Sequence, residues 1–230
     1  MSQMALPLKL ADHAVFDSFV ATGNEELVAA LVDIASGVDG SAFIWGGPST
    51  GKTHLLQAIC AHVGDRSVYV PFATLAGAGP GVIEGLASRD VVCLDDLEFV
   101  AGNPDWELGL FSLYNDLVAN GGSIVIAASM PPREAPIALA DLQSRLSQLP
   151  TWRLRVLEEQ ERLTALKLRA AHRGLELPDE TARYLLSRSR RDMASLYAML
   201  DTLDGEALRA QRRLTVPFVS DVLKGMSADD

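Results

Sequence analysis

The spacing of hydrophobic residues changes character near residue 157. Before it, short and nearly continuous apolar runs alternate with segments of helical spacing. Continuous runs are typical of strands covered by helices on both faces, and their alternation with helices predicts right-handed βαβ units and a parallel sheet. The predicted strands are Ala42–Trp45, Ser67–Val70, Val91–Leu94, Ile124–Ala127 and Trp152–Val156.

Helical patterns lie between these strands and then follow one another without interruption. In the first part they cover residues 25–34, 54–59, 82–87, 106–120 and 141–146. From Glu158 onward they cover Glu159–Arg173, Asp179–Ser187, Asp192–Leu203 and Val216–Leu223. We therefore predict an extended tail over residues 1–12, an α/β domain over residues 13–157 and a small all-helical domain over residues 158–230.

Composition narrows the class of protein. The 230 residues are 48% hydrophobic, which is enough for a sizeable core. The net charge of −10 argues against strong direct binding to DNA, because such binding neutralises phosphates with Lys and Arg. Two cysteines provide neither a disulfide framework nor a metal cluster. The sequence shows no membrane span and no leader peptide, so we expect a cytoplasmic protein without a membrane partner.

The first predicted strand leads into a phosphate-binding loop. Gly46, Gly51, Lys52 and Thr53 fill the pattern G-x-x-x-x-G-K-[ST] between a strand and a helix. Glycines let backbone N–H groups approach phosphate oxygens, and the start of the helix favours the same anion. We expect ADP or ATP to bind there, with Lys52 on the phosphates and Thr53 on Mg²⁺. The expected nucleotide-binding segment is Gly46, Gly47, Pro48, Ser49, Thr50, Gly51, Lys52, Thr53 and His54.

Two carboxylates follow the third predicted strand. In this fold the strand end lies beside the phosphate loop, so Asp95 is the expected metal-side residue. Asp96 is placed to orient or deprotonate an attacking water. Ser129 ends the next strand, where it could contact the γ-phosphate; a turn serine before Pro131 and Pro132 is the alternative.

Two arginines are ambiguous from their position alone. Arg145 is a single cation in an amphipathic helix and could be a surface charge or an arginine finger. Arg191 belongs to a basic cluster before a helix of the second domain, where it could be solvated or reach the nucleotide.

The tail contains Gln3, Leu6, Pro7 and Leu8, a composition suited to docking an extended peptide into an apolar pocket.

Taken together, these residues resemble the AAA+ ATPases of the bacterial replication-initiator (DnaA) group, and within it the Hda proteins. The resemblance runs nearly end to end and rests on the phosphate loop, Asp95-Asp96, Ser144-Arg145-Leu146, Arg191-Asp192-Met193 and residues 214–219. The tail looks like the sliding-clamp-binding motif of that family. The resemblance implies an AAA+ domain followed by a helical lid, with Arg145 as a finger acting on another molecule and Arg191 as a nucleotide contact.

The family also implies partners and an activity. It implies a regulator that binds the β subunit of DNA polymerase III, the sliding clamp, and promotes ATP hydrolysis by the initiator DnaA, which inactivates the initiator. Weak ATPase activity of its own and a homo-oligomer are both compatible with the sequence. The alternative is an autonomous AAA+ ATPase, such as a helicase-loader-like or DNA-remodelling factor. A small-molecule kinase is disfavoured because residues 74–88 contain almost no positive charge.

Overall fold

A computed structural model describes residues 14–188 and 193–226 of the chain. They form two compact units that divide between Val156 and Leu157. The tail residues Gln3, Leu6, Pro7 and Leu8, and Arg191, lie outside the described residues.

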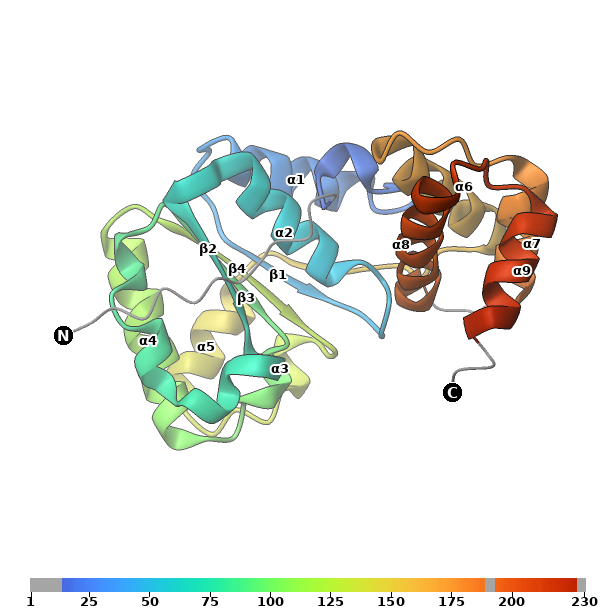
Figure 1. Cartoon of the computed structure of the whole chain (residues 1–230). Helices are drawn as coiled ribbons and strands as arrows, with labels where there is room; N and C mark the ends of the chain where they lie inside the picture. The colour runs from blue at the N-terminus through green and yellow to red at the C-terminus, as the bar shows by residue number, and fades with distance from the viewer. Residues whose placement is uncertain (1–13, 189–192, 227–230) are drawn as a thin grey trace. The chain divides into compact units, whose positions relative to one another are not determined.

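The first unit is built on a parallel sheet (Figure 1). Its five strands lie in the order β2-β3-β4-β1-β5. Its register places Ile44 of β1 beside Ala127 of β4, and Leu94 of β3 beside Ile126. Strands β3 and β4 are buried along their whole length, as expected for a sheet between two helical layers. The strands are β1 (Ala42–Trp45), β2 (Ser67–Pro71), β3 (Val91–Asp95), β4 (Ser123–Ala128) and β5 (Thr151–Arg153).

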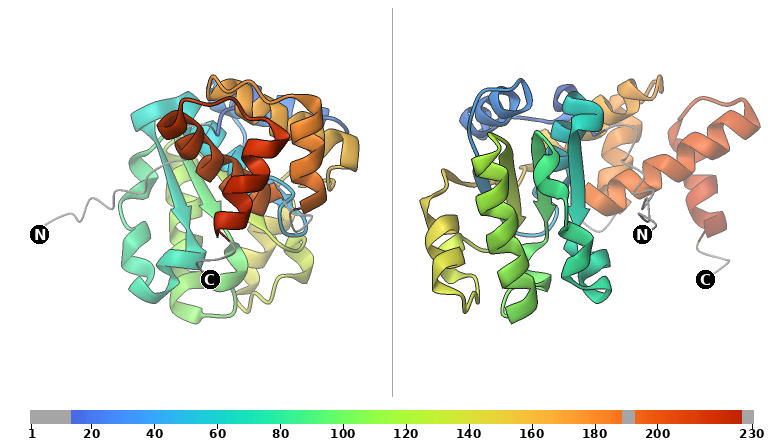
Figure 2. Two further views of the ribbon diagram at one scale, coloured as in Figure 1. Left: turned by 45° about the vertical axis from the view of Figure 1, so that its right-hand side comes forward. Right: turned by 90° about the vertical axis from the view of Figure 1, so that its left-hand side faces the viewer.

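Helices cover both faces of this sheet (Figure 2). On one face α1 (Glu25–Ala35) and α2 (Lys52–Val63) bury one apolar cluster. On the other, α3 (Phe72–Leu75), α4 (Pro104–Ala119) and α5 (Ala140–Gln148) bury a second. The sheet therefore separates two cores, and its strand ends position the loops that carry the candidate site.

Two buried thiols meet within the first cluster. Cys60 of α2 and Cys93 of β3 are both free, and their side chains are within hydrogen-bonding reach of each other. Burial raises the pKa of Cys93, and its hydrogen bond to Cys60 adds to that increase. These thiols connect the helix that follows the phosphate loop with the strand that ends in Asp95.

In the first unit, two predicted elements differ most clearly from the structure. The helix predicted at Val82–Ala87 is replaced by the 3-10 turns η4 (Pro80–Ile83) and η5 (Leu86–Ser88), because Gly85 between them has a positive φ of 76°. Strand β5 stops at Arg153, three residues earlier than predicted. The N–H of Arg155 donates to Oδ1 of Asn24 instead of continuing the sheet, and Val156 is exposed.

The second unit is helical throughout its described residues. Its helices are α6 (Glu159–His172), α7 (Asp179–Arg188), α8 (Met193–Ala210) and α9 (Val216–Met226). Helix α8 extends seven residues beyond the predicted end at Leu203, because Leu203 and Ala207 continue its buried stripe. Arg173 pairs with Asp201, and the Arg169 guanidinium lies 4.3 Å from the Tyr197 ring centroid, so polar contacts join α6 to α8.

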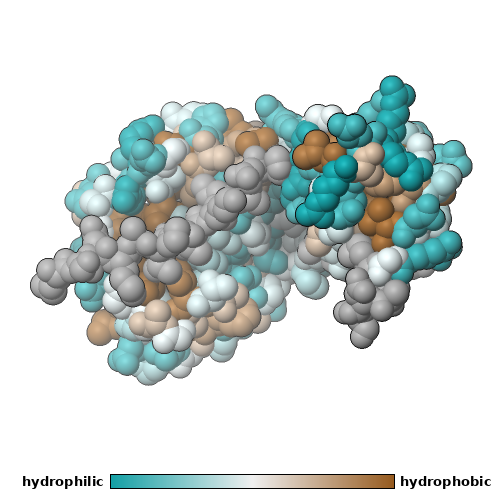
Figure 3. All heavy atoms as spheres, viewed as in Figure 1, coloured by the Kyte–Doolittle hydropathy of each residue, from teal (hydrophilic) through white to brown (hydrophobic). Residues whose placement is uncertain are grey.

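The surfaces of both units mix polar and apolar residues, as Figure 3 shows for one face. Within the described residues, none of the helices combines the length and apolar character that crossing a bilayer requires.

Candidate functional site

The loop between β1 and α2 has the backbone of a phosphate cradle. Gly51 stands at the start of α2 with a φ of 99°, in the left-handed region that glycine adopts without strain. A Cβ on Gly51 would lie 2.7 Å from Cε2 of Phe19, and one on Gly46 would lie 3.1 Å from Oγ1 of Thr50. Ser49 also has a positive φ, of 58°. The loop therefore contains left-handed backbone conformations at Ser49 and Gly51. It leads directly into the N-terminus of α2, whose free N–H groups can bind a phosphate.

Lys52 is folded back onto this loop. The residue is 9% exposed, and Nζ donates to the carbonyl oxygens of Gly46 (2.8 Å) and Gly47 (3.0 Å). An anionic phosphate oxygen is a stronger acceptor than a neutral carbonyl. The ammonium is thus held at the position where the motif requires a cation for phosphate.

Asp95 is fully buried at the end of β3, where three donors meet its carboxylate. Oδ2 accepts from Oγ1 of Thr53 (2.7 Å) and from the Tyr69 hydroxyl (2.9 Å), and Oδ1 accepts from the N–H of Asp96 (3.0 Å). The predicted juxtaposition of Thr53 and Asp95 is present. Tyr69 was not predicted; its signal in the sequence is a phenol inside an apolar strand, because a buried hydroxyl needs a partner. Burial raises the pKa of Tyr69, and the charge of Asp95 raises it further.

Asp96 lies beside this pair in a left-handed conformation, with a φ of 57°. Burial raises the pKa of Asp96 to about 6, and the charges of Asp95 and Glu98 add to this increase, while Lys52 opposes it. A carboxyl group with such a pKa can exchange a proton near neutral pH, as a general base must.

Ser129 follows β4 and is exposed. Its N–H donates to Oε2 of Glu98 at 3.2 Å, so a carboxylate that was not predicted from the sequence joins the ends of β3 and β4.

His54 contacts the segment before α1. Its Nε2 lies 3.0 Å from the carbonyl of Val15 and its ring packs on Phe19. His54 therefore connects α2 to the segment that precedes α1.

Arg145 is exposed in the last turn of α5. Among the described residues it has no ion-pair or hydrogen-bond partner. Helix α5 leads into β5, and Thr151 at the start of β5 pairs with Phe43 near the start of β1. The phosphate loop follows the other end of β1, so the last turn of α5 lies toward the opposite edge of the sheet.

Residues 159–223, which cover most of the helical unit, match the family described as the Hda lid domain. The fold resembles domain III of the replication initiation protein DnaA from Thermotoga maritima, with a TM-score of 0.75 and 22% identity over 94% of this chain and 98% of that one. The helical unit is therefore similar to the lid domain of Hda proteins, and the chain shares the fold of DnaA domain III.

Two further structures show how widely this fold is shared. AMPPCP-bound DnaA from Aquifex aeolicus has a TM-score of 0.66 at 22% identity, over 87% of this chain and 68% of that one. The RuvB Holliday junction branch migration motor from Thermotoga maritima has a TM-score of 0.63 at 18% identity, over 90% of this chain and 69% of that one. At these identities the similarity establishes the AAA+ fold and leaves the activity to be argued from the site.

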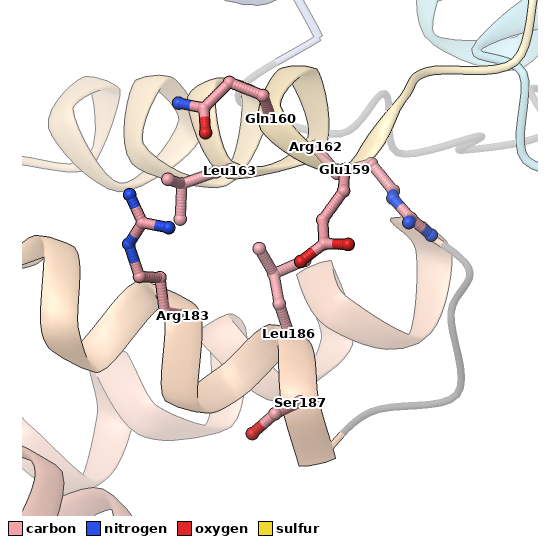
Figure 4. Close-up of a pocket in the computed structure, with 7 residues that line it drawn as sticks. All are labelled: Glu159, Gln160, Arg162, Leu163, Arg183, Leu186 and Ser187. Atoms are coloured by element: carbon pink, nitrogen blue, oxygen red, sulfur yellow. The ribbon is translucent and has the colours of Figure 1, made fainter.

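The helical unit contains a cavity of about 560 Å³ between α6 and α7 (Figure 4). Arg162 and Arg183 line it together with Glu159, so its charges are mixed.

Because Arg191 lies outside the described residues, its role as a nucleotide contact stays a prediction.

The residues of the first unit suit the phosphates of a Mg²⁺-bound nucleotide. Mg²⁺ in such sites takes one or two protein oxygens together with phosphate oxygens and water, which agrees with Thr53 and Asp95 as the protein donors. Within the described residues no group of three or more His, Cys, Asp or Glu side chains could hold a metal by itself. When bound, the metal would neutralise phosphate charge, while Lys52 would bind the phosphates and the loop would orient them.

Proposed function

We propose that this Hda-like protein binds ADP or ATP with Mg²⁺ and regulates the initiation of chromosome replication. Recruited by the sliding clamp, it promotes ATP hydrolysis by the initiator DnaA and so inactivates it. The lid match and the DnaA-like fold support a replication protein of this kind.

The observation that carries the proposal is the position of Arg145. Its guanidinium is exposed, without a partner among the described residues, and toward the edge of the sheet opposite to its own phosphate loop. A cation in that position suits a nucleotide held by another molecule. A guanidinium at a γ-phosphate stabilises charge in the transition state, and in GTPases such fingers contribute roughly 10³–10⁵ in rate.

The test is ATP turnover by DnaA in the presence of DNA-loaded clamp and this protein. Arg145→Ala should abolish the stimulation while leaving nucleotide affinity and thermal stability unchanged. Arg145→Lys should restore little, because an ammonium lacks the planar fork that engages two oxygens. Arg133→Ala is the matched control, since Arg133 is an exposed arginine on η7 (Pro132–Glu134), which packs next to α5. Full stimulation by Arg145→Ala would refute the trans-acting finger.

The clamp as a partner is proposed from the sequence of the tail alone. Gln3, Leu6, Pro7 and Leu8 resemble a clamp-binding peptide, in which apolar side chains enter a pocket and proline restricts the free peptide. We propose no strong direct contact with DNA, because the net charge is −10.

One observation favours a second candidate, an autonomous AAA+ ATPase. The raised pKa of Asp96, beside Asp95 and the phosphate loop, suits a base that activates water on the chain's own nucleotide. The two functions separate in one assay without DnaA. Turnover that is comparable to the DnaA-containing mixture and is lost in Asp96→Ala would favour the autonomous enzyme.

A further inference from the structure

Glu107, in the first turns of α4, has a buried carboxylate whose hydrogen bonds leave its own helix. The residue is 1% exposed. Its Oε1 accepts from the N–H groups of Gly102 (2.7 Å) and Ala138 (3.1 Å). Its Oε2 accepts from those of Ala138 (3.0 Å) and Leu139 (2.7 Å). One side chain thus joins the β3–α4 connection to the β4–α5 connection.

Capping of α4 does not depend on this carboxylate. Asn103 already caps the helix, because its Oδ1 accepts from the N–H groups of Asp105 (3.1 Å) and Trp106 (3.3 Å). In α5 the corresponding position is Leu139, which has no side-chain cap of its own. Glu107 therefore serves as an acceptor for the start of α5, where a negative charge also suits the helix dipole.

The first of the two connections begins at the candidate metal site. Asp95 and Asp96 are followed by η6 (Leu97–Phe99) and a tight turn in which the N–H of Ala101 donates to the carbonyl of Leu97 at 3.1 Å. The turn ends at Gly102, which has a φ of 83°. Only the short segment 97–102, held by these hydrogen bonds, separates Asp96 from the Gly102 N–H that donates to Glu107. We therefore expect a displacement of Asp96 to displace Gly102 as well.

The second connection leads to Arg145. Ala138 and Leu139 immediately precede α5. Leu142 and Leu146 form the buried face of α5, which fixes the rotation of the helix about its axis. The two connections also touch directly, because a Cβ on Gly102 would lie 3.3 Å from the carbonyl oxygen of Pro136. The first connection therefore lies against the segment that leads into the helix that presents Arg145.

We infer that Glu107 is a positioning residue that couples the chain's own nucleotide site to the orientation of Arg145. This inference rests on the proposed function, since it assigns a regulation to that same arginine. Nucleotide in the phosphate loop acts on Asp95 and Asp96, and Glu107 transmits the change to the start of α5.

The first test uses the unmodified full chain. Amide hydrogen exchange across residues 136–148 is measured with and without Mg²⁺-ADP. Coupling predicts that nucleotide slows exchange in this segment, although it lies in a different connection from the phosphate loop. Unchanged exchange across 136–148, with nucleotide shown to be bound, would overturn the inference.

The second test compares Glu107→Gln with Asn103→Ala in the DnaA hydrolysis assay. Glutamine keeps the size of the side chain but has one acceptor oxygen, so it cannot accept from all three N–H groups. Asn103→Ala weakens the same helix while leaving the bonds to Ala138 and Leu139 in place. Because a misplacement of about 1 Å can cost about 100-fold in rate, Glu107→Gln should lower the maximal stimulation by about 10- to 100-fold. The concentration of the variant that gives half-maximal stimulation of DnaA, and its affinity for ADP, should not change.

The outcomes distinguish the inference from the proposed function. If Arg145→Ala retains stimulation, the trans-acting finger is wrong and the proposal about Glu107 falls with it. If Arg145→Ala loses stimulation while Glu107→Gln keeps it, the finger stands and the coupling is wrong. Equal losses in Glu107→Gln and Asn103→Ala would also overturn the coupling, because general weakening of α4 would then explain both.

Discussion

Single residues at the strand ends carry the charges of the candidate site. The buried Asp95 carboxylate receives hydroxyl groups from α2 and β2 and a backbone N–H, so it joins three segments. Lys52 is folded onto the carbonyls of the loop and is also buried. A buried charge is tolerated where hydrogen bonds satisfy it, and these side chains are held in place before a ligand arrives.

Lys52 should contribute more to nucleotide affinity than to folding. Lys52→Ala removes a charge-assisted contact with phosphate worth roughly 1.5–3 kcal/mol, or about 10- to 150-fold in the dissociation constant. Calorimetric titration with ADP and Mg²⁺ measures the change. Equal affinity in wild type and variant would exclude Lys52 from the phosphate site.

Asp96 should make the stability of the nucleotide-free protein depend on pH. Its pKa of about 6 lies above the ordinary value, so between pH 4 and 6 the folded protein binds the proton more tightly than the unfolded chain. Stability therefore falls as the pH rises through this range. Asp96→Asn should be more stable than wild type at pH 7.5, by about 1 kcal/mol after allowance for solvent screening.

The measurement is thermal unfolding of both proteins without nucleotide at several pH values. The advantage of Asp96→Asn should shrink as the pH falls from 6 to 4. Asparagine also accepts the left-handed backbone at this position, so strain should not obscure the comparison. A constant difference across the range would show that Asp96 does not titrate as inferred.

The sequence identifies some of these residues and misses others for a physical reason. The phosphate-loop residues and Asp95 follow from local spacing. Tyr69 and Glu98 act through partners 26 and 31 positions away along the chain. Their roles appear only when parallel strands bring their ends together, and a single sequence contains no record of that pairing.

At the scale of elements, the phosphate loop depends on its contact with the segment before α1. A Cβ on Gly51 would lie 2.7 Å from Cε2 of Phe19, so the Phe19 ring must shift to admit a side chain there. Gly51→Ala should therefore cost about 1–3 kcal/mol of stability, through both the positive φ and this clash. Gly47→Ala is the control, because a Cβ there would meet nothing within 4 Å and its backbone has no positive φ. Comparable melting temperatures for the two variants would show that the Phe19 contact is soft.

Elements with one dominant signal were predicted well, and those with competing signals were not. The buried strands β3 and β4 lie within a residue or two of the predicted positions, because their apolar runs are uninterrupted. The segment 80–88 has helical spacing but also Pro80, Gly81 and Gly85, and its backbone turns into 3-10 geometry. Helix α8 continues past Gly205, where packing outweighs the weak local preference of glycine.

At the scale of the whole molecule, the tail and the folded units should be separable in function. Removing residues 1–12 should abolish binding to the sliding clamp in a pull-down, because the proposed anchors Gln3, Leu6 and Leu8 are lost. Nucleotide affinity and melting temperature should remain at their wild-type values, since the described cores begin after the tail. Clamp binding by the shortened protein would place the clamp contact elsewhere on the chain.

The paired thiols of Cys60 and Cys93 offer an internal probe of how this protein opens. Alkylating reagents attack a thiolate that solvent can reach, and both sulfur atoms are buried between α2 and β3. Modification must therefore wait for an opening that separates the helix after the phosphate loop from the strand before Asp95. Because a nucleotide would hold both of these elements, labelling of the two cysteines should slow when it binds, and the labelling rate would report occupancy of the site without any added chromophore.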